Sequence, residues 1–143
     1  MPLTVAGELS VACRLGRGPV NVGRARERAR KALAGWARSV HTSLAELIVS
    51  ELVTNALCHG NGAVEMRVSY AGGELRVEVH DGGAGRPVRQ HVTAGDECGR
   101  GLELLDGLIE LHGGERGVID DQAGPGKTVY VELLLPTNPA GAL

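Results

Sequence analysis

The sequence is poor in aromatic residues. Its 143 residues include no Phe, two Tyr and a single Trp, Trp36. Aliphatic side chains must therefore supply the hydrophobic core, and the hydrophobic share of 43% is ordinary for a globular protein. A chain of this length is expected to form one domain, which buries about two-thirds of its unfolded surface. We expect that domain to span residues 1–143, with a core from about 8 to 135.

The sequence also lacks a charge excess and a long apolar run. Its formal net charge of −2 gives no reason to expect a surface that binds nucleic acid. No stretch approaches the roughly 18 apolar residues of a membrane-spanning helix. The first residues lack the basic and apolar regions of a signal peptide. We therefore expect a cytoplasmic domain without direct contact to membrane or nucleic acid.

Residues that form disulfide frames or metal sites are few and widely spaced. Cys13, Cys58 and Cys98 are odd in number, far apart and without a CxxC pair. Disulfide-framed domains and structural zinc sites need paired or closely spaced cysteines, so we expect three free thiols in a reducing compartment. The five histidines have no metal-ligand spacing, and we expect His59 and His80 to be hydrogen-bonded structural residues.

The hydrophobic pattern changes its period along the chain. Between residues 42 and 58, apolar side chains recur every three or four positions, which is typical of a helix that buries one face. After residue 62 the pattern alternates, which is typical of strands with one apolar face. Gly72-Gly73, between two such strands, predicts a hairpin turn. The pattern predicts helices over 20–38, 42–58 and 102–112, strands over 8–15, 63–70, 74–80, 116–120 and 128–135, and a surface loop over 86–98.

Two polar residues lie on the apolar face of the predicted 42–58 helix. Glu51 and Asn55 are one turn apart and share the face that carries Leu47, Ile48 and Leu52. Burying an unpaired polar group costs on the order of 2–7 kcal/mol, so both side chains need partners inside the fold. From this helix alone two interpretations stay open. One is a ligand or metal site, and the other is a pair satisfied by backbone or water.

Two common nucleotide-binding patterns are not matched. Lys127 and Thr128 after Gly126 suggest a P-loop, but that motif needs Gly where position 121 has Asp. A P-loop also leads into a helix, whereas the residues after Thr128 predict a strand. Gly99 and Gly101 lack the third glycine of a dinucleotide-binding fingerprint, and they follow a loop instead of a strand.

What remains is an ordered series of polar and glycine-rich segments with compatible chemistry. Asp81 ends a predicted strand and can accept a hydrogen bond from an exocyclic amine, and the glycines after it let the backbone approach a flat base. Gly99 and Gly101 at a helix start offer free N–H groups and the positive end of the helix dipole, which favour phosphate. Asn55 offers a carbonyl oxygen to Mg²⁺. Glu51 could orient or deprotonate an attacking nucleophile.

These segments together resemble a known family. Residues 51–56 resemble its N box, 81–85 its first glycine box, 99–102 its second, and Gly126-Lys127-Thr128 its last box. The family is the ATP-binding domain shared by sensor histidine kinases, gyrase, the Hsp90 chaperone and MutL. The chain looks most like its small single-domain branch, the bacterial anti-sigma factor serine kinases.

The resemblance implies an α+β fold, a two-layer α/β sandwich with a mixed, mostly antiparallel sheet and helices on one face. It implies ATP and Mg²⁺ as ligands. Asp81 would bind the adenine amine, Asn55 would hold Mg²⁺, and Glu51 would be the catalytic base. It also implies nucleotide contacts from the glycine boxes and the residues beside them: Gly83, Gly85, Arg86, Gly99, Arg100, Gly101, Leu102 and Thr128.

Two functions follow as hypotheses. The first is an ATP-dependent serine/threonine protein kinase that sequesters a sigma factor and phosphorylates the antagonist of that complex. The second is a non-catalytic nucleotide-binding module that uses ATP or ADP to switch protein partners, and a homodimer is compatible with either. No phosphoacceptor histidine domain precedes the predicted site, so we expect a regulator of this kind more than a sensor histidine kinase.

Overall fold

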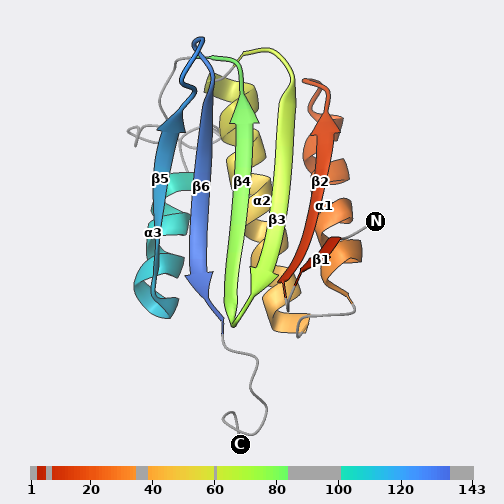
Figure 1. Cartoon of the computed structure of the whole chain (residues 1–143), viewed down its shortest axis with the longest axis vertical. Helices are drawn as coiled ribbons and strands as arrows, with labels where there is room; N and C mark the ends of the chain where they lie inside the picture. Colours follow the sequence, from red (N-terminus) through yellow and green to blue (C-terminus); the bar gives the residue numbers. More distant parts are fainter. Residues whose placement is uncertain (1–2, 6–7, 35–38, 60, 84–100, 136–143) are drawn as a thin grey trace, which may run out of the picture.

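The chain folds into two layers, a sheet and a set of helices that cover one of its faces. The structure is a computed structural model that describes residues 3–5, 8–34, 39–59, 61–83 and 101–135. Figure 1 shows the sheet in front and the three helices behind it. This confirms the expected two-layer α+β sandwich. The sheet is not mixed, however, because every pairing between described strands is antiparallel.

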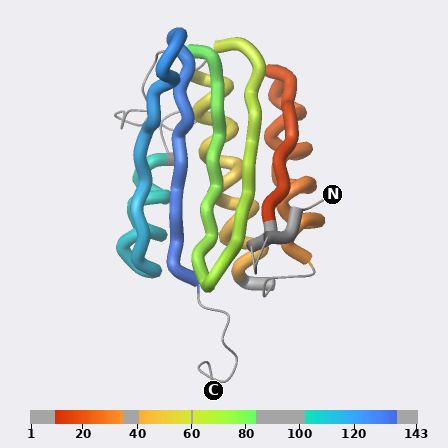
Figure 2. Tube along the Cα trace, viewed as in Figure 1, coloured from red at the N-terminus to blue at the C-terminus, as the bar shows by residue number. Residues whose placement is uncertain are grey.

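The strands form a six-stranded sheet in the order β1-β2-β3-β4-β6-β5. The order departs from the sequence only at its end, where β6 lies between β4 and β5 (Figure 2). The predicted strands all form, and a three-residue strand too short to show a period adds to the edge. The strands are β1 (Leu3–Val5), β2 (Glu8–Leu15), β3 (Val64–Ala71), β4 (Glu74–Asp81), β5 (Gly114–Asp120) and β6 (Lys127–Leu134).

The three predicted helices also form, with different ends. The first ends at Leu33 and not at residue 38, and the second begins three residues before its predicted start. No Gly or Pro separates residues 39 and 42, so the helical backbone continues back to Ser39. The helices are α1 (Val20–Leu33), α2 (Ser39–His59) and α3 (Gly101–His112).

The β3–β4 hairpin has the turn that its glycines predict. Gly72 and Gly73 have φ values of 59° and 79°. A two-residue turn with positive φ at both positions matches the twist of the flanking strands, and glycine adopts it without strain. The turn sets a register in which Val68 lies opposite Val77. Both side chains then point to the helical layer and are completely buried.

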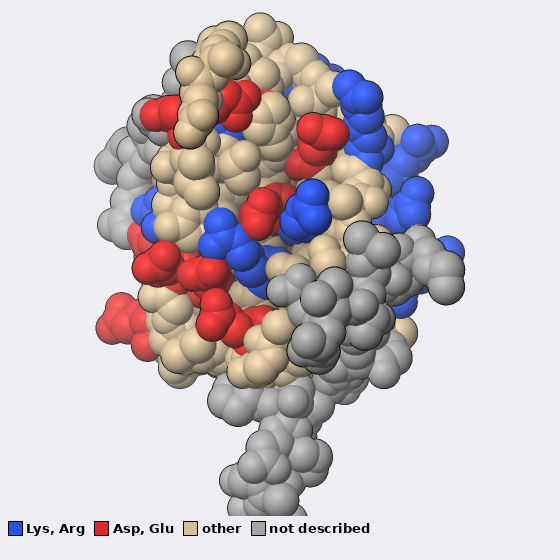
Figure 3. Space-filling model, in the orientation of Figure 1, with Lys and Arg blue, Asp and Glu red and all other residues tan. Residues whose placement is uncertain are grey.

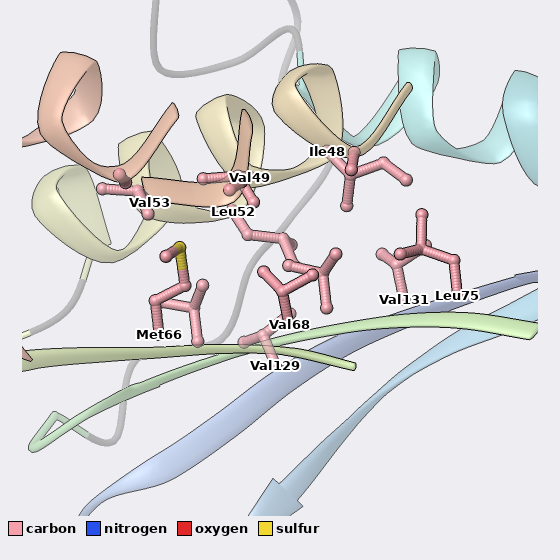
Figure 4. Close-up of a cluster of buried hydrophobic side chains, with 14 of the residues drawn as sticks. Ile48, Val49, Leu52, Val53, Met66, Val68, Leu75, Val129 and Val131 are labelled. Atoms are coloured by element: carbon pink, nitrogen blue, oxygen red, sulfur yellow. The ribbon is translucent and has the colours of Figure 1, made fainter. Parts of the chain in front are cut away.

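The core lies between α2 and the central strands. Figure 4 shows side chains from α2 pointing at the inward rows of the sheet. Alternate residues of β3, β4 and β6 are buried, as the period of two predicts. The labelled members of this core are Ile48, Val49, Leu52, Val53, Met66, Val68, Leu75, Val129 and Val131.

The C-terminal end of α2 is held by an arginine from the β2–α1 connection. The Arg17 guanidinium donates to the carbonyl oxygens of Leu57 at 2.9 Å, Ala56 at 3.1 Å and Gly62 at 3.0 Å. The last carbonyls of a helix have no partner within the helix, and a cation there also complements the helix dipole. Arg17 therefore fixes the end of α2 against the start of α1.

The uncovered face of the sheet is polar. In Figure 3, Lys and Arg side chains are interspersed with Asp and Glu over the strands. Arg76 of β4 pairs with Glu78 on the same strand and with Glu132 on β6. Such an alternation of buried apolar and exposed charged rows explains why helices cover one face alone.

The cysteines depart from their predicted state. Cys13 is a free thiol, but Cys58 is disulfide-bonded, so the expectation of free thiols is wrong for Cys58. Spacing along the sequence does not reveal whether two sulfur atoms meet in the folded chain. Because Cys58 is disulfide-bonded, the cysteines no longer support the expectation of a reducing compartment. Among the described helices, none is both long and apolar enough to cross a bilayer.

Candidate nucleotide site

A small cavity lies where α2 faces the ends of β4 and β6. Its volume is about 10 Å³, which is room for about one water molecule. The predicted residues Asn55 and Asp81 both line it, so the structure brings these two segments together although they are far apart in the sequence. The lining residues are Leu52, Asn55, Ala56, His59, Val79, Asp81, Lys127 and Val129.

Two polar side chains of α2 line this cavity, and each has one buried atom without a partner among the described residues. Asn55 and His59 are four residues apart, so they lie one above the other on one face of the helix. Asn55 Nδ2 and His59 Nε2 are buried, and no hydrogen-bond partner for either atom lies among the described residues. Buried polar atoms are nearly always paired in native proteins, so two unpaired ones in one cavity point to a ligand or bound water. His59 was expected to be hydrogen-bonded, and its Nε2 is not.

Asp81 continues the inward row of β4. Leu75, Val77 and Val79 point to the core, and Asp81, two residues further on, is 1% exposed. Its Oδ1 accepts a hydrogen bond from the backbone N–H of Gly83 at 2.8 Å. A buried carboxylate needs partners of this kind, and one backbone N–H does not compensate its charge.

The compensating charge comes from Lys127, the first residue of β6. The register of the two strands places Lys127 directly opposite Asp81. Its Nζ lies 2.9 Å from Asp81 Oδ1 and 3.0 Å from Oδ2, and it donates at 3.0 Å to the carbonyl oxygen of Gly83. The two side chains are 3% and 1% exposed, so this is a fully buried ion pair.

Gly126 allows the two strands to meet at this point. A Cβ at this position would collide with the Asp121 carboxylate and would lie 2.9 Å from the carbonyl oxygen of Asp81, a distance that real Cβ atoms essentially never show. The adjoining turn is tied back to β4, because His80 Nε2 lies 2.9 Å from Asp121 Oδ2. This contact bears out the hydrogen-bonded role expected of His80. Gly126 and the His80–Asp121 contact therefore hold Lys127 over Asp81.

Glu51 lies one turn before Asn55 but faces a different hollow. That hollow has a volume of about 480 Å³ and is open to solvent. Burial raises the pKa of the Glu51 carboxyl above its usual 4.5. Glu51 therefore has an environment suited to proton transfer, although it does not line the cavity of Asn55 and Asp81. The hollow is lined by Arg26, Ser43, Glu46, Leu47, Ser50 and Glu51.

Thr128 is on the opposite face of the sheet. It is paired in register with His80 and lines a hollow of the uncovered face, together with residues of β2, β3 and β4. Because side chains alternate along a strand, the inward neighbours of Thr128 are Lys127 and Val129. In the last glycine box, Lys127 is thus the residue that reaches the cavity.

The two glycine boxes are only partly covered by the described residues. Gly83 is present beside Asp81, and Gly101 is the first residue of α3, where helical N–H groups lack partners within the helix. Leu102 is 3% exposed and belongs to the hydrophobic core. The expected contacts from Gly85, Arg86, Gly99 and Arg100, and the loop 86–98, lie outside the described residues.

Sequence reasoning missed the role of Lys127, and a signal for it was present. Counting back in twos from Leu133 through Val131 and Val129 reaches Lys127, so the alternation alone assigns it to the inward face. The same count from Leu75 reaches Asp81. That the two residues form a pair could not be read from the alternation, because it depends on which strands are neighbours.

Comparison with known proteins supports the family that the sequence motifs resemble but not the anti-sigma factor branch, because the matched relatives are described as sensor or histidine-protein kinases. A family model described as histidine kinase-, DNA gyrase B-, and HSP90-like ATPase matches residues 41–137. The chain is 33% identical over 103 residues to the alginate biosynthesis sensor protein KinB of Pseudomonas aeruginosa, covering 64% of the chain and 17% of that protein. It is 31% identical over 120 residues to the signal transduction histidine-protein kinase AfsQ2 of Streptomyces coelicolor, covering 72% of the chain and 22% of that protein.

A solved structure is also similar. It is the histidine kinase domain from the Erythrobacter litoralis EL346 blue-light activated histidine kinase, with a TM-score of 0.48 and 24% sequence identity. The match covers 81% of this chain and 60% of that one. The chain spans about a fifth of the length of the curated relatives it matches.

Proposed function

Because the chain belongs to the histidine kinase-, DNA gyrase B- and HSP90-like ATPase family, we propose that it binds ATP with Mg²⁺ and transfers the γ-phosphoryl group to a protein partner. The observation that carries this proposal is the cavity in which Asp81, Asn55 and His59 converge. It combines a buried acceptor for an amine with polar atoms that have no partner in the part of the chain that the structure describes.

The residues of the cavity fit the parts of the nucleotide. Asp81 can accept a hydrogen bond from the adenine amine. The amide of Asn55 has an oxygen of the kind that Mg²⁺ takes, and its unpaired N–H can donate to a phosphate or water oxygen. When bound, Mg²⁺ supplies the charge neutralisation that phosphoryl transfer needs. The cavity holds only about one water, so residues around it must move when an adenine ring enters.

Glu51 is proposed as the general base. Its raised pKa makes it a stronger base than an exposed carboxylate, and it remains half-buried beside an open hollow through which an acceptor can approach. A serine hydroxyl must lose a proton as it attacks, whereas a neutral imidazole nitrogen attacks through a lone pair. This need for a base favours a serine or threonine acceptor, and we propose an antagonist of a sequestered sigma factor as the partner that carries it.

A histidine acceptor is the second candidate, because the matched relatives are described as sensor or histidine-protein kinases. The two acceptors differ in a chemical property of the product. Phosphoserine survives acid and is lost in alkali, whereas phosphohistidine survives alkali and is lost in acid. A third outcome is a regulatory module that binds ATP and selects partners without any transfer.

The test is a pull-down from the native cell with and without ATP that carries a γ-phosphate label and Mg²⁺. A labelled partner stable to acid supports the serine/threonine kinase, and one stable to alkali supports histidine transfer. Partners recovered only with nucleotide and never labelled would support the regulatory module. Failure to bind ATP in a calorimetric titration would overturn the proposal itself.

Variants of α2 separate binding from chemistry. Glu51→Ala should keep Mg-ATP affinity within a few-fold and lower turnover by about 10²–10⁴-fold, since a positioned base acts mainly in the transition state. Asn55→Ala should lower both affinity and turnover, because it removes a ligand to Mg²⁺. Glu46→Ala is the matched control, since Glu46 is a carboxylate of the same helix and the same hollow. Loss of turnover in Glu46→Ala equal to that in Glu51→Ala would contradict the assignment of the base.

A further inference from the structure

We propose that Lys127 is a specificity-determining residue that acts through Asp81: its buried ammonium group pairs with the Asp81 carboxylate and holds it with one acceptor position free, and so selects a 6-amino purine over a 6-oxo purine. The inference rests on the proposed nucleotide-binding function and goes beyond it. It concerns a residue that would not touch the nucleotide. What a ligand can find at this site is set by the hydrogen-bonding positions of the two side chains that are already occupied.

Among the described residues, three acceptors surround the ammonium group of Lys127. A lysine ammonium carries three N–H donors. The three acceptors around Lys127 Nζ are the two oxygens of Asp81 at 2.9 and 3.0 Å and the carbonyl oxygen of Gly83 at 3.0 Å. Its side chain is 3% exposed, so it is also shielded from solvent. Lys127 therefore contributes charge and position to the site.

The carboxylate of Asp81 has one acceptor position left. An ionised carboxylate has about four lone-pair positions. Among the described donors, Oδ1 accepts from Gly83 N–H at 2.8 Å and from Lys127, while Oδ2 accepts from Lys127. The remaining position on Oδ2 can accept one hydrogen bond and cannot donate one. An amine meets this requirement, and a carbonyl oxygen does not.

Lys127 both compensates this carboxylate and holds it in place. Asp81 is 1% exposed, and burying a carboxylate without a counter-charge is very costly. Among the described residues that line the cavity, His59 is the only other ionisable group, and it comes from α2. Without Lys127, the described donor that remains on the carboxylate is the N–H of Gly83, so the free acceptor position would no longer be fixed toward the base.

The test compares ADP with IDP, which carry an amine and a carbonyl oxygen at position 6. Calorimetric titrations of the wild-type chain should show tighter binding of ADP. Lys127→Met should reduce the ratio of the two affinities by about 10- to 100-fold, the size of a hydrogen bond to a charged group. Lys127→Arg keeps the charge and should restore most of the ratio. Lys31→Met removes an exposed lysine of α1 and should leave the ratio unchanged.

A double variant covers the case in which Lys127→Met does not fold. Asp81→Asn with Lys127→Met removes both charges together, which proteins tolerate better than one unpaired buried charge. Since an amide can turn either its oxygen or its N–H₂ group to the base, the double variant should bind ADP and IDP within a few-fold of each other. If Lys127→Met or the double variant folds and keeps the wild-type ratio of ADP to IDP affinity, Lys127 does not have the proposed role, although the nucleotide site itself would stand. Binding of neither nucleotide by the wild-type chain would overturn the proposed function and this inference with it.

Discussion

The buried ion pair makes a strong prediction about stability. Lys127 and Asp81 are 3% and 1% exposed, and their charged atoms are 2.9 Å apart. Removing one partner of such a pair leaves an uncompensated buried charge and costs about 3–5 kcal/mol. Single domains have a total stability of about 5–15 kcal/mol, so Lys127→Met should lose a large part of it. At roughly 3 °C per kcal/mol for a domain of this size, its Tm should fall by about 10–15 °C.

The assay is a double-mutant cycle measured by urea unfolding, without nucleotide. It needs the wild-type chain, Lys127→Met, Asp81→Asn and the double variant. Each single variant should be strongly destabilised, and the double variant should recover most of the loss, because replacing both charges removes the desolvation cost along with the attraction. Lys31→Met is the control, since the exposed Lys31–Glu27 pair at 3.6 Å should contribute less than about 1 kcal/mol.

Two results would refute this reasoning. The first is a loss in Lys127→Met no larger than that in Lys31→Met, which would mean that the lysine is not buried against Asp81 in solution. The second is a double variant whose loss equals the sum of the two single losses, which would mean that the two charges are not coupled.

Three further predictions concern the residues around the site. Burial raises the pKa of Glu51, so its contribution to stability is fully present below pH 4.5 and is lost as pH rises through the folded pKa. Glu51→Gln should therefore melt at a higher temperature than wild type at pH 7, with the difference vanishing below pH 4.5, in melting curves from pH 4 to 8. Arg17→Met should cost about 1–3 kcal/mol and speed hydrogen exchange in the last turn of α2, because three carbonyl oxygens lose their donor; unchanged exchange there would argue against the cap. Gly126→Ala should cost about 1–3 kcal/mol in urea unfolding, since its Cβ would meet both the Asp121 carboxylate and, at 2.9 Å, the Asp81 carbonyl oxygen, and a neutral effect would show that the turn relaxes freely.

Local patterns in the sequence determined the elements and the side of each that is buried. The alternation in β3, β4 and β6 identifies the rows that face the helices, and it includes Asp81 and Lys127 at their ends. Gly72-Gly73 identifies the hairpin turn, because only residues tolerant of positive φ form it. The spacing of Asn55 on α2 predicts a buried amide, and Asn55 is buried. All of these features depend on residues within a few positions of one another.

The tertiary structure decided which of these elements meet. Asp81 and Lys127 are paired because β6 lies between β4 and β5, a choice of neighbour that involves residues 46 positions apart. The helical wheel places Glu51 and Asn55 on one side of α2. The two side chains nevertheless leave the helix at directions about 40° apart around its axis, which is enough for each to face different neighbouring strands and helices. Asn55 consequently reaches the cavity of Asp81, and Glu51 faces the hollow beside α1. Contacts of this range depend on the packing of whole layers, which no local period encodes.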